Sequence, residues 1–209
     1  MAEPQSKILR EVNDYYSAKI REHGQGPRGV DWNGEESQFQ RFQQLLKIIQ
    51  AEGDFSIIDV GCGYGALIDY LQKNFKKYKY IGIDISEEMI ASARARYVHD
   101  ESVRFHVSAI SPVHADYSVA SGIFNVRLKH DDDEWWSYLT NTLDQLNETS
   151  SKGFSFNCLT KYSDAEKIRN YLYYADPCKL FDWCKRRYSR QVALLHDYGL
   201  YEFTILVRK

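Results

Sequence analysis

The stretch that decides the fold is Ile57-Ile58-Asp59-Val60-Gly61-Cys62-Gly63-Tyr64-Gly65-Ala66, followed about twenty residues later by Tyr80-Ile81-Gly82-Ile83-Asp84. The first part predicts a short buried strand that runs into a glycine-rich turn and opens a helix. The second part predicts another buried strand, which ends in a carboxylate. Together they indicate a βαβ unit that holds an adenosine-containing ligand at the carboxyl ends of its strands.

The glycine spacing distinguishes between two kinds of ligand. A dinucleotide fingerprint is Gly-x-Gly-x-x-Gly, and its pyrophosphate sits on the helix N-terminus. This chain instead has Asp-x-Gly-x-Gly-x-Gly, with Asp59 at the end of the strand. An acid two residues before Gly61 would repel a pyrophosphate but suits a cationic aminoacyl group. A purely structural βα turn and a nicotinamide-dependent oxidoreductase remain the alternatives.

This motif resembles the first motif of the class I S-adenosylmethionine-dependent methyltransferases, position by position. Asp84 falls where that family has the acid that binds the ribose hydroxyls, and the following Ile85-Ser86-Glu87-Glu88-Met89-Ile90 is similar to the family's continuation. The resemblance implies S-adenosyl-L-methionine as the cofactor. The expected cofactor-binding residues at the strand ends are Asp59, Gly61, Cys62, Gly63, Gly65, Asp84, Ile85, Met89, Ser108, Ala109 and Ser121.

Composition and charge narrow the class of protein. The chain has 209 residues, of which 44% are hydrophobic and 27% charged, which is typical of one soluble domain with a full core. A net charge of −2 and a pI near 6.3 give no electrostatic footprint for long nucleic acid. Neither a membrane-length apolar run nor a signal-peptide core is present, and the four cysteines form no Cys-x-x-Cys pair. We therefore expect a cytoplasmic protein with reduced thiols and no bound metal.

Periodicity along the chain predicts an α/β fold. Helical spacing at 6–23 and 35–50 predicts two helices that form an N-terminal lid over residues 1–52. Residues 55–209 are expected to form the Rossmann-like core of a single methyltransferase domain, 1–209, whose mostly parallel, doubly wound sheet has seven strands and an antiparallel last strand. The strands are expected at 56–60, 80–84, 103–108, 117–123, 153–159, 191–196 and 201–207, with the last two as a hairpin and a polar loop at 147–152.

Two features concern the ends of the cofactor. Arg41 lies three residues after Gln38 on one face of the second helix and would hold the cofactor's carboxylate as a two-pronged ion pair. An exposed helix arginine is the alternative. The resembled family often has an acid just past the third strand, which binds the exocyclic amine of adenine. This chain has Ser108 and Ala109 there, so backbone groups or the Ser108 hydroxyl would have to replace that contact.

The acceptor side carries fewer signals. The Pro-Pro-aromatic motif of base amino-methylating enzymes is absent after the fourth strand, and so are the paired glutamates of arginine methyltransferases. His130 is the candidate general base, with His196 as the alternative, although a lone histidine is more often structural. The acids at 131–134 suit a helix N-terminus, with a metal cluster as the sharper alternative. The candidate substrate-binding residues are Tyr16, Trp32, Phe124, Arg127 and Tyr174.

We therefore predict methyl transfer from S-adenosylmethionine to an oxygen or nitrogen atom of a small molecule, with no nucleic-acid or membrane partner. Methylation of RNA or protein is one alternative. A protein that binds the cofactor without catalysis is another.

Overall fold

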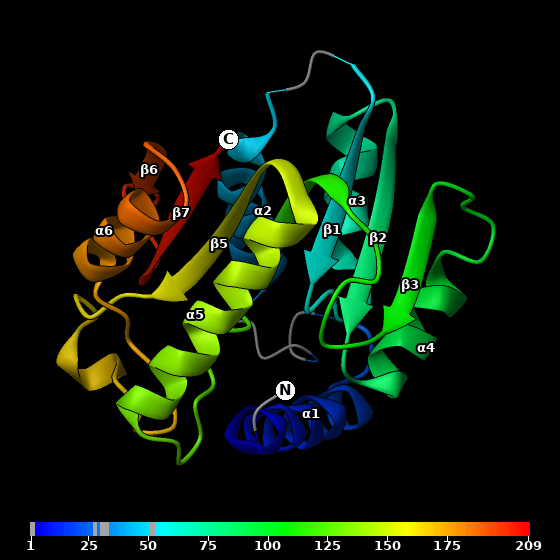
Figure 1. The fold of residues 1–209 in the computed structure, drawn as a ribbon. Coiled ribbons are helices and arrows are strands. Elements are labelled where there is room, and N and C mark those ends of the chain that lie inside the picture. The colour runs from blue at the N-terminus through cyan, green and yellow to red at the C-terminus, as the bar shows by residue number, and fades with distance from the viewer. Residues whose placement is uncertain (1–2, 27–28, 30–33, 51–52) are drawn as a thin grey trace.

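The computed structural model describes residues 3–26, 29, 34–50 and 53–209, and in this part of the chain seven strands form one sheet (Figure 1). Their order across the sheet is β3-β2-β1-β4-β5-β7-β6. Strands β1 to β5 pair in parallel, whereas β7 runs antiparallel to both β5 and β6. The strands are β1 (Phe55–Val60), β2 (Tyr78–Asp84), β3 (Val103–Val107), β4 (Ala115–Ala120), β5 (Ser150–Leu159), β6 (Gln191–Leu195) and β7 (Glu202–Arg208). The predicted Rossmann-like sheet, its antiparallel last strand and the closing hairpin are confirmed.

Helices cover both faces of this sheet. α5 packs on β4 and β5, α6 packs on β6 and β7, and α2 packs on β5 and β7. α1 contacts α4 and α5 and crosses the carboxyl ends of the central strands (Figure 1). The helices are α1 (Glu3–His23), α2 (Glu35–Leu45), α3 (Ala66–Asn74), α4 (Glu87–Arg96), α5 (Asp132–Thr149) and α6 (Pro177–Arg187), with short 3-10 turns at Leu46–Ile48 and Ala165–Lys167. In the described residues, no helix is long and apolar enough to span a membrane.

α5 and the two strands beneath it share a fully buried aromatic core. Trp135, Phe154 and Phe156 are completely inaccessible to solvent. The indole Nε1 of Trp135 donates a hydrogen bond to the carbonyl of Phe124 at 3.0 Å, so the helix also fixes the loop that follows β4. Burying aromatic side chains of this size stabilises the fold by about 1.5–3 kcal/mol each. This packing places one face of α5 beside the strand ends.

The polar loop expected at 147–152 is wrong, because α5 runs to Thr149 and β5 begins at the next residue. Thr149 Oγ1 donates to the carbonyl of Gln145 at 2.8 Å, and Ser150 Oγ donates to the carbonyl of Leu146 at 2.7 Å. Both hydroxyls satisfy the last helical carbonyls, which would otherwise need a loop or water. The polar residues that predicted a loop therefore form the end of a helix.

The fourth strand is also shorter than predicted, since β4 ends at Ala120 rather than at Ile123. Asn157 on β5 accepts a hydrogen bond from the backbone N–H of Gly122 at 2.7 Å, which bends the chain away from the sheet. As a result, Ser121 and Ile123 lie in a loop at the strand ends and face the cavity described below.

Candidate functional site

The glycine loop after β1 is held against the end of β2. The backbone N–H groups of Gly61 and Cys62 donate to the carbonyl of Ile83 at 2.7 and 3.0 Å. Gly61 has a φ of +75°, and a Cβ at this position would lie 2.2 Å from Cγ2 of Ile123. Only glycine allows both this left-handed backbone conformation and this close approach. The loop thus leaves its backbone open to a ligand.

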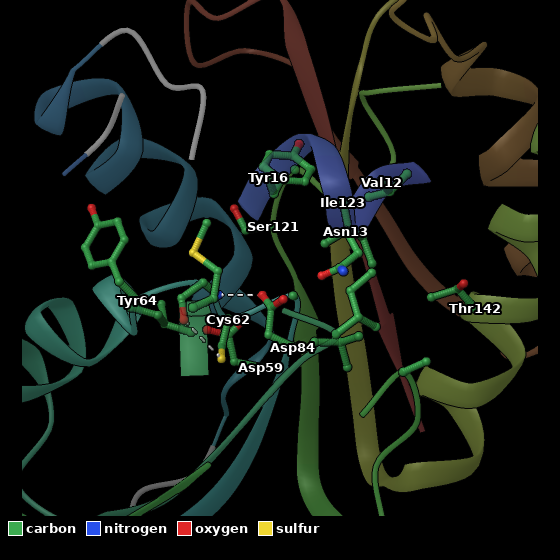
Figure 2. Close-up of a pocket in the computed structure, with 18 of the residues that line it drawn as sticks. Val12, Asn13, Tyr16, Asp59, Cys62, Tyr64, Asp84, Ser121, Ile123 and Thr142 are labelled. Carbon is green, nitrogen blue, oxygen red and sulfur yellow. Dashed lines mark hydrogen bonds between the residues drawn. The ribbon is translucent and has the colours of Figure 1, made fainter. Parts of the chain in front are cut away.

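Asp84 at the end of β2 is fixed by backbone donors. Its Oδ2 accepts a hydrogen bond from Gly63 N and its Oδ1 accepts one from Ser86 N, both at 2.9 Å. Burial raises the pKa of this carboxyl, and the two N–H groups oppose that shift. Both oxygens keep lone pairs toward the cavity, where Figure 2 shows the side chain. A carboxylate held in this way can accept hydrogen bonds from vicinal hydroxyl groups.

Asp59 on β1 is the most deeply buried carboxyl of the site. It is 3% exposed, and its Oδ2 accepts a hydrogen bond from the Tyr80 hydroxyl at 2.7 Å. Desolvation raises the pKa of Asp59 to about 7, with a smaller increase from the charge of Asp84 and an opposing effect of the Tyr80 hydrogen bond. A cation brought into the cavity beside Asp59 would supply the countercharge that the protein itself lacks there.

A cavity joins these groups at the carboxyl ends of the strands (Figure 2). It has an unfilled volume of about 1090 Å³, part of it open to solvent. The expected site residues that line it are Tyr16, Asp59, Gly61, Cys62, Gly63, Asp84, Ile85, Met89, Ser108, Ala109 and Ser121. Gly65 lies behind the loop at the N-cap of α3 and does not line the cavity.

One face of α1 covers the cavity, and Leu9, Val12, Asn13 and Tyr16 line it from there. Of these four, only Tyr16 was an expected site residue. These residues are separated by three, one and three positions, so they lie on one face of a helix. That spacing could have identified them from the sequence. The other lining residues that the sequence did not indicate are Gln38, Phe42, Val60, Tyr64, Ala66, Leu67, Gly122, Ile123, Tyr138, Thr142 and Gln145. Most of them come from α2, α5 and the loops, which sequence spacing does not bring together.

α1 is held by polar contacts on both sides of the cavity. On the α4 side, Ser17 Oγ lies 2.9 Å from Ser86 Oγ and donates to Glu88 Oε2 at 3.1 Å. On the α5 side, Glu11 Oε2 lies 3.1 Å from Nε2 of His130. The expected lid therefore crosses the cavity and is fastened at two points.

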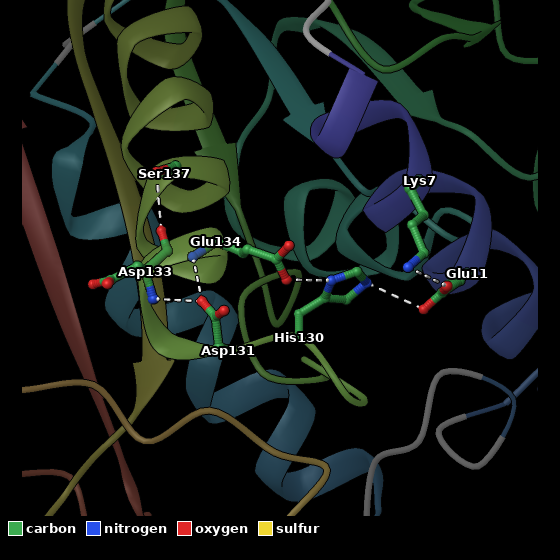
Figure 3. A network of polar contacts seen from close by, with 7 residues as sticks. All are labelled: Lys7, Glu11, His130, Asp131, Asp133, Glu134 and Ser137. Atoms are coloured by element: carbon green, nitrogen blue, oxygen red, sulfur yellow. Dashed lines mark hydrogen bonds and ion pairs between the residues drawn. The ribbon is translucent and has the colours of Figure 1, made fainter.

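His130 takes part in that fastening and does not line the cavity. Its two ring nitrogens lie 3.1 Å from Glu11 and 3.0 Å from Glu134 on α5 (Figure 3). Lys7 approaches Glu11 at 4.0 Å, and Asp131 caps α5 by accepting from the N–H groups at the start of that helix. The structure therefore does not bring His130, the expected general base, to the cavity: both ring nitrogens lie against carboxylates.

Arg41 is likewise placed away from the cavity. Its Nε donates to Glu202 Oε2 on β7 at 2.8 Å, and both side chains are buried. The expected ion pair with the cofactor's carboxylate does not fit this position. Gln38, on the same helix, lines the cavity instead, and its Oε1 accepts from the Tyr64 hydroxyl at 3.3 Å. That bond orients the amide so that its nitrogen remains as a donor.

Three of the expected substrate residues also lie elsewhere. Phe124 is fully buried in the core under α5, and the Arg127 guanidinium pairs with Asp132. The hydroxyl of Tyr174 accepts a hydrogen bond from the backbone N–H of Arg169 at 3.1 Å. None of the three lines the cavity. Trp32 lies outside the described residues.

The expected metal alternative gains no support from the geometry. Within the described ranges, no group of three or more His, Cys, Asp or Glu side chains is arranged to hold a metal ion. The acids at 131–134 instead form the N-terminus of α5, where Asp131 accepts from Asp133 N at 3.0 Å and from Glu134 N at 2.9 Å. Acids in this position stabilise a helix by interacting with its N-terminal N–H groups.

Comparison with known proteins identifies the family. The sequence matches the family described as "Methyltransferase domain" over residues 57–149. It is 61% identical, over 164 residues, to "Putative methyltransferase Rv1506c" of Mycobacterium tuberculosis, covering 78% of this chain and 99% of that protein.

Solved structures show the same fold. The magnesium protoporphyrin IX methyltransferase of Synechocystis, with bound S-adenosylhomocysteine, has a TM-score of 0.66 at 13% identity and covers 99% of this chain and 100% of that chain. The small RNA methyltransferase HEN1 has a TM-score of 0.61 at 15% identity and covers 83% of this chain and 25% of that chain. These two act on very different acceptors, so the fold alone does not identify the acceptor here. The chain belongs to the S-adenosylmethionine-dependent methyltransferases.

Proposed function

We propose that this enzyme methylates an oxygen or nitrogen atom of an uncharged small molecule. The observation that carries the proposal is the position of α1, which crosses the strand ends and lines the same cavity as the glycine loop. An acceptor must therefore fit beneath a helix. An extended nucleic-acid strand or a protein surface needs an open groove instead.

The residues around the cavity fit S-adenosylmethionine. Asp84 accepts from the ribose hydroxyls, and Asp59 faces the cationic aminoacyl end. The amide nitrogen of Gln38 donates to the carboxylate, which takes the role that the sequence assigned to Arg41. When bound, the cofactor supplies a methyl group on a sulfonium, already activated for in-line displacement. Ile85 and Met89 provide the apolar walls between these polar contacts.

The chain contributes mainly alignment and exclusion of water. Holding two reactants in line supplies about 7–11 kcal/mol of the barrier. The Cys62 thiol and the Tyr64 and Tyr138 hydroxyls on the cavity wall stay protonated near neutral pH, because burial raises their pKa. The two carboxyls on the wall, Asp59 and Asp84, are occupied by the cofactor in this proposal. The acceptor must therefore attack with a lone pair that it already carries, and it loses its proton after the methyl group has moved.

The charge of the cavity wall indicates the class of acceptor. In the part of the chain that the structure describes, no Lys, Arg or His side chain lines the cavity. Asp59 and Asp84 are acidic, and Asn13, Thr142 and Gln145 are neutral and polar. An anionic acceptor would be desolvated with no cationic side chain on the wall and with two carboxyls nearby, at a cost of several kcal/mol. A neutral molecule with hydroxyl, amide or amine groups suits this wall.

A turnover assay with purified enzyme and S-adenosylmethionine tests the proposal. Release of S-adenosylhomocysteine is measured with four acceptor sets: neutral polar molecules, carboxylates, RNA and protein. Methylated neutral products, identified by mass spectrometry, support it. Turnover confined to carboxylates, RNA or protein overturns it, and so does tight cofactor binding without turnover of any set.

A pair of variants on α1 localises the acceptor site. Asn13 lines the cavity, and its Oδ1 lies 3.4 Å from Ser17 Oγ, so the amide nitrogen remains available as a donor. Losing one such hydrogen bond costs about 0.5–1.5 kcal/mol, so Asn13→Leu should lower kcat/KM for the acceptor several-fold. The affinity for S-adenosylhomocysteine should not change. Asp14→Asn, on the exposed face of the same helix, is the matched control.

A further inference from the structure

We propose that the side-chain amide of Gln145, on α5, binds the amino edge of the cofactor's adenine. It would take over the contact for which the resembled family uses an acid after the third strand. The inference concerns the cofactor alone, so it is independent of which acceptor the enzyme methylates.

Strand order fixes where the adenine must lie. Asp84 ends β2, and β3 is the next strand outward in the sheet. With the ribose on Asp84, the base therefore extends toward the end of β3, where Ser108 and Ala109 line the cavity. A polar group in this region must therefore form hydrogen bonds with the amino edge of the base.

The residues after β3 do not supply that group. Ser108 Oγ donates to the carbonyl of Ile110 at 2.7 Å and accepts from its N–H at 3.2 Å. The hydroxyl proton and one of the two lone pairs of the oxygen are thus used within a local turn, so Ser108 can accept one further bond but cannot donate one. Ala109 has no polar side-chain atom, so neither side chain offers a donor and an acceptor side by side.

α5 lies beside the loop after β3 because the connection between β3 and β4 contains no helix that would separate them. Residues 108–114, which connect β3 to β4, form bends without helix or strand. Ala109, Thr142 and Gln145 line the main cavity, and they also line a small adjoining cavity of about 210 Å³ together with Ile110 and others. Two cavities therefore place the α5 side chains beside the loop that receives the base.

Gln145 is the polar group that remains available there. Thr142 is buried and donates its hydroxyl proton to the carbonyl of Tyr138 at 2.9 Å. Gln145 is partly exposed, and its side-chain amide makes no hydrogen bond to another described residue. An amide offers a donor and an acceptor side by side, which is how Asn and Gln pair with adenine in nucleic-acid recognition. The geometry and the chemistry both single out Gln145.

Calorimetry with two ligands tests this assignment. S-adenosylhomocysteine carries the 6-amino group, whereas S-inosylhomocysteine carries a 6-oxo group in its place. A two-contact pair of this kind discriminates between bases by about 1–3 kcal/mol, so the wild-type enzyme should bind the amino form about tenfold more tightly. Gln145→Leu should bind both ligands with Kd values within about twofold of each other.

Two further variants keep the test decisive. Asn141→Leu alters an exposed position on the same helix and should retain the wild-type preference. Gln145→Glu restores an acceptor for the amine and should also prefer the amino form. Circular dichroism and thermal unfolding show that each variant is folded. If Gln145→Leu is folded and keeps both the preference and the wild-type Kd, the assignment is refuted.

Discussion

Replacing Asp59 with asparagine is expected to stabilise the cofactor-free protein and to weaken cofactor binding. Asp59 is buried on β1 with the Tyr80 hydroxyl as its hydrogen-bond donor. Asparagine has nearly the same shape, and its Oδ1 still accepts from Tyr80. The variant therefore removes the charge but keeps the contact.

The magnitude follows from the pKa of Asp59. Burial raises that pKa from 3.8 to about 7. Since the pKa is raised on folding, the stability linked to the protonated carboxyl is fully present below pH 3.8 and is lost as the pH rises through 7. A shift of about 3 units at 1.36 kcal/mol per unit amounts to about 4 kcal/mol in all. Between pH 5 and pH 8 the expected loss is about 2.5 kcal/mol.

Urea unfolding of cofactor-free protein measures this difference. Wild type, Asp59→Asn and the surface control Asp197→Asn are unfolded at pH 5 and at pH 8, and free energies of unfolding are extrapolated to water. The advantage of Asp59→Asn over wild type should grow by about 2.5 kcal/mol between the two pH values. Asp197 is exposed, so its variant should follow the wild type.

Cofactor affinity should respond in the opposite sense. The carboxylate form of Asp59 attracts the cationic aminoacyl end, so the affinity of wild type for S-adenosylmethionine should rise by about tenfold from pH 5.5 to pH 7. Asp59→Asn should bind more weakly, with no such rise. The reasoning is refuted if the stability advantage of the variant is the same at pH 5 and pH 8, or if both proteins show the same pH dependence of Kd.

Three other substitutions test parts of the site separately. In His130→Gln the single amide group cannot contact both Glu11 and Glu134, so amides of α1 should exchange hydrogen faster, as measured by mass spectrometry, whereas exposed His196→Gln should leave them unchanged. Arg41→Leu leaves the carboxylate of Glu202 buried and unpaired, which should lower the free energy of unfolding in urea by about 3–5 kcal/mol. The Kd for S-adenosylhomocysteine should not change in that variant, and a large increase would restore Arg41 as a cofactor ligand. Gly61→Ala should lower the free energy of unfolding by about 1–2 kcal/mol through backbone strain alone. Its methyl group would also lie 2.2 Å from Cγ2 of Ile123, so the loop must shift and calorimetry should show weaker cofactor binding.

The fold was predictable because its deciding signals are local. A buried strand, three glycines and a second strand ending in Asp84 specify one βαβ unit within thirty residues. The strand ends then gather at one edge of a parallel sheet, so Asp59 and Ser121 reach the same cavity as expected. The helical face of α1 was equally readable from its spacing.

The rest of the site depends on contacts between distant parts of the chain. Arg41 and Glu202 are 161 residues apart, and His130 and Glu11 are 119 residues apart. Nothing in the local sequence around Arg41 or His130 indicates a partner so far away. Gln145 was missed for a related reason, because nothing in the local sequence shows that this part of α5 lies beside the loop after β3. Tertiary packing decides whether such side chains face a ligand.

The two fastenings of α1 have a consequence for how ligands exchange. Ser17 contacts Ser86, which caps α4 beside Asp84, and Glu11 contacts His130 at the start of α5. Because α1 is anchored on both sides of the cavity, it cannot open by rotating about a single hinge. Cofactor and product must then pass beneath it or wait for one tie to break. Both contacts therefore affect the rate at which cofactor and product leave. Weakening either contact should speed product release and shorten the time for which the cofactor stays bound.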